Sequence, residues 1–400
     1  MRWKRRFFWM LPVILALWFT PLIAGAQEGG EGQDASITNQ LVRSQLNQLQ
    51  TKQVESFWSQ LSDDYGKFFD RGNFPNLFDM LLSGKKEWSI KDVALAFLRY
   101  FFHEILYNGK LLGSILILTV FSMILQTLQT AFERNQVSKV AYAIAFLVLI
   151  ILMVNSFHVA VEAARTAIGR MIDFMLALVP LMLTLMMTMG NIGSATLFHP
   201  FIVFMIHTIG TFIYTLVFPL LFFSAILSIV SSLSDKYKVN QLAGLMRKIS
   251  ISLLGGLLTI FLGVLSIQGT ASAVTDGITL RTAKYITGNF VPVIGRTISE
   301  AADTVVGASL LVKNTIGLAG VIILLMICAF PAVKILSLAL IYNFSAAVMQ
   351  PLGNSPIIES LETIGRTLIY IFAALATVGL MFFLAITIIV ASGNIAAMVR

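Results

Sequence analysis

Long apolar runs separated by short polar segments dominate the chain from about residue 111 to its C-terminus. Leu111–Thr130 and Val140–Val161 are each about twenty residues long, which is the length that a helix needs to cross a hydrocarbon core of roughly 30 Å. From Phe174 to Ser234 the sequence contains no Asp, Glu, Lys or Arg. The pattern predicts an all-α, polytopic membrane protein, with about 6–8 transmembrane helices in residues 111–400.

Further single crossings are predicted at Phe174–Met189, Ile249–Ile267, Asn314–Val333 and Leu368–Ser392. The charged segment from Arg165 to Asp173 reads as an amphipathic connector between two of the spans. Leu197–Leu233 contains Gly210 and Pro219 and exceeds an ordinary crossing. It predicts either one strongly tilted helix or a pair of short, broken segments.

The N-terminus has the pattern of a secretory signal peptide at residues 1–26, with basic residues, an apolar stretch and Ala24-Gly25-Ala26 as the cleavage site. An uncleaved signal anchor is the alternative. Residues 27–110 are then an exported, mostly helical segment. In it, apolar side chains recur at helical spacing from Val54 to Phe68 and again from Ile90 to Ile105. Ser89 and Asp92 fit a capping box, and the second helix could lie on the membrane surface or pack on the membrane domain.

The exported segment sets the orientation of the first spans. The first span returns the chain to the cytoplasm at residues 133–139, where Arg134 and Lys139 fit the positive-inside rule. Further along, the 235–248 loop and the 270–314 segment each carry four basic residues, yet they flank one span. If residues 197–233 cross twice, the 235–248 loop is cytoplasmic; if they cross once, the 270–314 segment is.

The composition agrees with a membrane protein and excludes several other classes. Hydrophobic residues make up 57% of the chain and charged residues 12%, against roughly 25% charged in soluble domains. The net charge is +8, but the basic residues do not form a stripe with aromatic residues between them, so nucleic-acid binding is not predicted. Cys328 is the single cysteine, which rules out an intrachain disulfide and a cysteine-based metal site.

One predicted span carries a stripe of small residues, a pattern that lets a neighbouring helix approach closely. The stripe consists of Ser252, Gly256, Thr259, Gly263 and Ser266. The spacing does not tell whether the neighbour belongs to the same chain or to another subunit, so a homo-oligomer is left open.

Residues 270–314 are half polar and lack an apolar run of spanning length. They predict either a re-entrant, cavity-lining segment or an interfacial amphipathic loop. The candidate pore or re-entrant residues are Pro292, Gly295, Arg296, Glu300, Asp303 and Lys313.

No catalytic, cofactor-binding or metal-binding residues are predicted. The sequence has no His-Glu-x-x-His motif and no phosphate-binding loop of the Gly-x-x-x-x-Gly-Lys type. Ser194 and His207 are only a faint match to an intramembrane serine protease, because a lone Ser and His in a membrane helix usually serve packing.

Three neighbouring segments carry a family resemblance. They are Asn289–Gly295 (NFVPVIG), Ser299–Val305 (SEAADTV) and Ser309–Asn314 (SLLVKN), and Phe174–Pro180 and Gly190–Pro200 add support. Together they resemble the stage III sporulation AE family, and the similarity extends over most of the chain from about residue 110.

The resemblance implies a non-enzymatic subunit of a secretion-like channel in the mother-cell membrane around the forespore, needed after engulfment. It implies as partners the other stage III sporulation proteins of the same operon, including a cytoplasmic ATPase and ring-forming proteins, and stage II sporulation protein Q. Two alternatives stay open: a self-contained secondary transporter of a small solute, and a passive membrane scaffold for the ring proteins.

Overall fold

We describe the protein from a computed structural model. The described residues are 42, 44–45, 51–69, 74, 77, 81, 90–131, 136–233, 239–290, 294–352 and 355–398, with backbone only at 90, 129–131, 136–139, 194, 197–198, 233, 268–290, 294–303, 352 and 393–398. The predicted signal peptide and Ser89 lie outside them. Every element in this part of the chain is a helix, as the all-α prediction requires.

The part predicted to be exported contributes α3 (Lys52–Tyr65), a 3-10 turn (Gly66–Phe68) and α5 (Ile90–Tyr107). The membrane part consists of α6 (Gly109–Ala131), α7 (Gln136–Thr188), α8 (Ile192–Phe212), a π-helical segment (Ile213–Val217), α9 (Phe218–Leu233), α10 (Asn240–Phe290), α11 (Ile294–Met349), a 3-10 turn (Gln350–Leu352) and α12 (Pro356–Met398). Among the described residues, six helices are long and apolar enough to cross a membrane. This number confirms the lower end of the predicted range.

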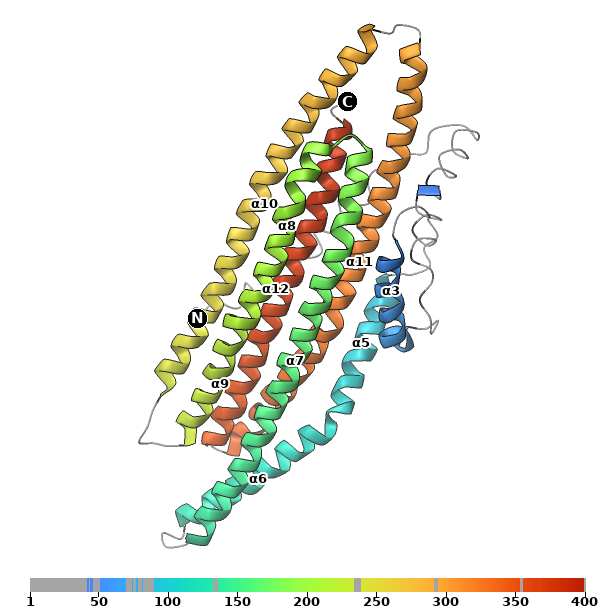
Figure 1. The fold of residues 1–400 in the computed structure, drawn as a ribbon. Helices are drawn as coiled ribbons and strands as arrows, with labels where there is room; N and C mark the ends of the chain where they lie inside the picture. Colours follow the sequence, from blue (N-terminus) through green and yellow to red (C-terminus); the bar gives the residue numbers. More distant parts are fainter. Residues whose placement is uncertain are drawn as a thin grey trace.

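Helices α7, α11 and α12 pack together as the centre of the bundle. The rod formed by α8 and α9 and then α10 cover one side, and α5 and α3 lie against α11 on the other (Figure 1). Glycines permit the close approach at the centre. A Cβ at Gly320 of α11 would lie 2.6 Å from Leu178 of α7, and one at Gly379 of α12 would lie 2.7 Å from the Cys328 sulfur of α11.

Residues 197–233 form a single rod, because α8, the π-helical segment and α9 follow one another without a break. Of the two predicted alternatives, the single helix is the one observed. Pro219 has no N–H to donate to the preceding turn, and the π-helical turn just before it is a common way to absorb such a defect.

Helix α7 corrects the prediction of two spans joined by a connector. Gln136–Thr188 is one continuous helix that includes Arg165, Arg170 and Asp173. The charges lie on partly or fully exposed positions and do not interrupt the backbone hydrogen bonds. The apolar side chains in the C-terminal half of α7, such as Phe174 and Leu178, are buried in the bundle. The hydropathy of this half therefore does not mark a second crossing.

The backbone of the predicted 270–314 segment is helical through Phe290 and again from Ile294. It continues α10 and begins α11, and these two helices extend past the ends of the others in Figure 1. Pro292 lies outside the described residues. The side chains of Gly295, Arg296, Glu300 and Asp303 are likewise outside the described part, so their predicted role is not tested.

Candidate functional site

Helices α3 and α5 dock on the bundle of long apolar helices through an aromatic cluster centred on Phe330 of α11, which is fully buried. The ring of Tyr65 from α3 stacks on it with centroids 3.8 Å apart and planes at 3°. From α5, Phe97 lies 4.8 Å away and Tyr100 packs edge-on at 5.2 Å. Three elements that are distant in sequence therefore meet at one phenylalanine.

A salt bridge connects α3 to α7 beside this cluster. Arg170 Nη1 lies 2.8 Å from Asp64 Oδ2, and both side chains are partly exposed. Phe57 of α3 also packs edge-on against Phe174 of α7, with centroids 5.3 Å apart. Because an exposed ion pair is worth about 1 kcal/mol or less, the aromatic contacts carry most of the docking energy.

The cluster keeps its two tyrosines protonated. Burial, reinforced by the Asp64 carboxylate, raises the pKa of Tyr65 to about 12. Burial also raises the pKa of Tyr100 well above its usual range, with a further contribution from Glu104. The phenolic groups are therefore neutral at any physiological pH.

The raised pKa values predict that docking fails at alkaline pH. A group with a raised folded-state pKa gives stability that is complete below its unfolded value of about 10 and is lost as pH rises towards the folded value. We expect the tyrosinate absorbance of Tyr65 to appear only near pH 12, together with release of α3. Comparing the wild-type titration with Tyr65→Phe isolates this group, and a Tyr65 signal near pH 10 would contradict the burial.

Backbone hydrogen bonds of the helical i to i−4 type continue across the junction between α5 and α6. Asn108 donates its backbone N–H to Glu104 O at 3.0 Å and accepts at its own carbonyl from the Leu112 N–H at 3.0 Å. The Asn108 side-chain amide also donates to Glu104 O at 2.8 Å. The helical hydrogen-bond pattern thus passes from α5 into α6.

Lys313 is the predicted pore residue whose side chain the structure describes. It is fully buried, and its Nζ donates to the backbone carbonyl of Val390 on α12 at 2.8 Å. Charged residues inside membrane helix bundles are rare and face the interior or a polar partner. Lys313 therefore tethers α11 to α12 near the base of the α10–α11 extension, and in this structure it faces a neighbouring helix.

The small-residue stripe of α10 lies on the outside of the bundle. Ser252, Gly256, Thr259, Gly263 and Ser266 are all exposed. A Cβ built at Gly256 or Gly263 would meet nothing within 4 Å. The opposite face of α10, with Leu254, Leu257 and Phe261, makes the buried contacts, so the stripe faces away from the described part of the bundle.

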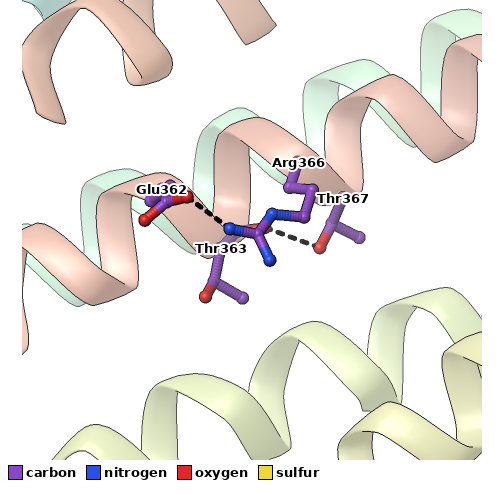
Figure 2. Close-up of polar contacts among 4 residues, drawn as sticks. All are labelled: Glu362, Thr363, Arg366 and Thr367. Carbon is purple, nitrogen blue, oxygen red and sulfur yellow. Dashed lines mark hydrogen bonds and ion pairs between the residues drawn. The ribbon is translucent and has the colours of Figure 1, made fainter. Parts of the chain in front are cut away.

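Polar side chains mark the end of the bundle where α12 begins. Arg366 and Glu362 form an ion pair one turn apart on α12, and Thr367 donates to the carbonyl of Thr363 on the same turn (Figure 2). Arg247 of α10 lies over the ring of Tyr370, 5.9 Å from its centroid. The Arg247–Tyr370 contact therefore joins α10 to α12 at this end of the bundle.

Within the described ranges, no group of three or more His, Cys, Asp or Glu side chains is placed to hold a metal ion. Sequence reasoning missed the Phe330 cluster and the Asp64–Arg170 pair. The spacing of apolar and aromatic side chains in α3 and α5 indicated that each helix packs on something. It did not identify Phe330 of α11 as the residue on which they pack.

The comparisons with known proteins agree with the fold. Residues 72–393 match the family described as stage III sporulation protein AE. The chain is 49% identical over 399 residues to stage III sporulation protein AE of Bacillus subtilis (strain 168), covering 99% of this chain and 100% of the relative. No solved structure matches. The chain therefore belongs to the stage III sporulation protein AE family.

Proposed function

We propose that this protein is a non-enzymatic membrane subunit of a channel complex that links the mother cell and the forespore. Family membership carries the proposal, and the multi-pass bundle with its docked exported helices supports it. The protein resides in the mother-cell membrane around the forespore and is needed after engulfment. Its partners are the other stage III sporulation proteins of the same operon, with their ATPase and ring-forming members, and stage II sporulation protein Q.

The proposed topology follows from one crossing per membrane helix, starting from an exported α3 and α5. The α6–α7 and α9–α10 loops are then cytoplasmic, and the latter is followed by Arg247 and Lys248, as the positive-inside rule favours. The tip of the α10–α11 extension is exported. From the sequence, a single crossing by residues 197–233 would have made the 270–314 segment cytoplasmic. That segment is now exported and the 235–248 loop is cytoplasmic, because α7 counts as one crossing and not two.

The α10–α11 extension is the proposed contact region for the ring-forming proteins. It projects beyond the other helices (Figure 1), on the side where the topology places the intermembrane space. The loops at the opposite end face the cytoplasmic ATPase. One chain thereby contacts components on both sides of the membrane.

The topology predicts opposite labelling of two exposed positions. In a Cys328→Ser background, an impermeant maleimide added to intact cells should modify Ile192→Cys at the start of α8 and leave Gln241→Cys unmodified. Both side chains are exposed at helix ends, and permeabilised cells provide the control for reactivity. The reverse pattern would mean that α7 crosses the membrane twice.

Deletion of the gene in the spore-forming bacterium that encodes this protein tests the proposed function. We expect development to stop after engulfment, with restoration by the wild-type gene. Normal spores from a clean deletion would rule the proposal out. Solute uptake by the purified protein alone in liposomes would instead support a self-contained transporter, and conduction that requires the operon partners would support the channel subunit.

A further inference from the structure

Helix α5 has two apolar faces, and the bundle covers only one of them. Phe97, Tyr100 and Glu104 point towards α11 and the aromatic cluster. A second set of apolar side chains, here called the α5 stripe, points away from the protein. It consists of Leu95, Leu98, Phe102 and Leu106, which are 44%, 50%, 55% and 78% exposed.

The α5 stripe continues directly into the outer face of the first span. Helical hydrogen bonds run through Asn108, which separates α5 from α6. The chain bends between α5 and α6 (Figure 1), and exposed apolar side chains lie on both sides of the bend, with Leu106 78% and Ile117 71% exposed. Beyond Ile117, the residues Phe121, Ile124 and Leu128 are also exposed, and α6 is one of the six helices suited to cross a membrane.

Polar residues border the α5 stripe in the way that an interfacial helix requires. Arg99 and His103 each follow a stripe residue by one position, and both are exposed. Lys91 precedes the stripe and Lys110 follows it. Basic side chains beside an apolar face allow a helix to sit at the boundary between lipid headgroups and acyl chains.

We propose that α5 is an interfacial helix, and that the α5 stripe inserts into the bilayer leaflet next to the N-terminal end of α6. The helix then has a double role: one face holds the exported aromatic cluster against α11, and the other anchors it in lipid. The exported helices are thereby fixed at a set height above the membrane. The inference concerns the α5 surface only, and it stands whether or not the protein forms a channel.

Lipid fits the stripe better than a second copy of the chain. The four side chains expose on the order of 400 Å², about half of what each partner contributes to a standard protein interface. A second copy that covered only the α5 stripe would leave the exposed apolar side chains of α6 uncovered. The continuity with a lipid-facing span favours one continuous lipid contact.

The test uses the full-length protein in phosphatidylethanolamine–phosphatidylglycerol vesicles. In a Cys328→Ser background, an environment-sensitive fluorophore is attached at Leu98→Cys or Phe102→Cys, and at His103→Cys as the matched control on the same helix. We expect the two stripe positions to show blue-shifted emission and at least twofold stronger quenching by spin-labelled lipid than His103→Cys. Iodide in the water phase should show the opposite preference.

Two results would overturn the proposal. Equal iodide quenching at all three positions, with no extra quenching by spin-labelled lipid, would place the α5 stripe in water. Efficient disulfide formation between two copies of Phe102→Cys in the vesicles would show that a second copy covers it. The second stripe position, Leu98→Cys, guards against local disturbance by one substitution, because both positions must respond together.

Discussion

Replacing Gly379 by leucine is expected to destabilise the centre of the bundle by about 1–3 kcal/mol or more. A Cβ at this position would lie 2.7 Å from the Cys328 sulfur and 3.9 Å from the Met171 sulfur. Cys328 is too short to move aside, since its Cβ would itself be 3.4 Å away. Helices α7, α11 and α12 must then separate, and thermal unfolding in detergent should shift to a lower temperature.

Gly256→Leu is the matched control for this prediction. Gly256 also lies in the middle of a membrane helix, but a Cβ there would meet nothing within 4 Å. The purified protein should therefore tolerate leucine at this position with little change in unfolding temperature. Equal destabilisation by both substitutions would contradict the packing of α7, α11 and α12. Loss of assembly with Gly256→Leu alone would show that another subunit uses the α10 stripe.

Hydropathy alone located the membrane helices and failed to divide them correctly. It measures the apolar character of a segment and not what covers it. The apolar side chains of Phe174 and Leu178 of α7 are covered by other helices of the bundle. Those of Ile144 and Leu147 in the same helix are exposed and suited to lipid. The two halves of α7 therefore look like two spans, although the helix runs straight through them.

The residues at helix junctions show a similar limit. Pro219 and Gly210 predict a weak point in residues 197–233, but neither decides between a break and a π-helical turn. The observed continuous rod depends on packing with α7 and α10: Tyr214 donates to the carbonyl of Arg165, and Ser224 donates to the carbonyl of Ala243. Such long-range contacts are not encoded in local sequence patterns.

The candidate site was predictable only in part. The sequence singled out Lys313 as one of the polar residues of the half-polar 270–314 segment, and its side chain is fully buried, but its predicted pore role stays a prediction. The small-residue stripe was found by its spacing, which cannot specify on which side of α10 the rest of the chain lies. The sequence did not single out Phe330. One phenylalanine among many in an apolar helix looks like the others until the positions of α3 and α5 are known.

Phe330→Ala is expected to release α3 and α5 from the bundle. The side chain contacts Tyr65 of α3 and both Phe97 and Tyr100 of α5. Truncating a fully buried phenylalanine costs about 3–5 kcal/mol, which exceeds the contribution of the nearby exposed Asp64–Arg170 ion pair. Limited proteolysis should then cleave α3 in the variant under conditions that leave it intact in the wild-type protein.

Leu325→Ala is the control, because Leu325 is an exposed large apolar residue of the same helix and makes none of these ring contacts. We expect α3 to remain protected in that variant. Arg170→Ala should weaken protection only slightly, since the ion pair is partly exposed. If Arg170→Ala released α3 and Phe330→Ala did not, the docking would be electrostatic, and the aromatic cluster would only fill space. With the expected order, the aromatic contacts at Phe330 hold α3 and α5 on the bundle, and the other face of α5 is the one that we propose to contact lipid.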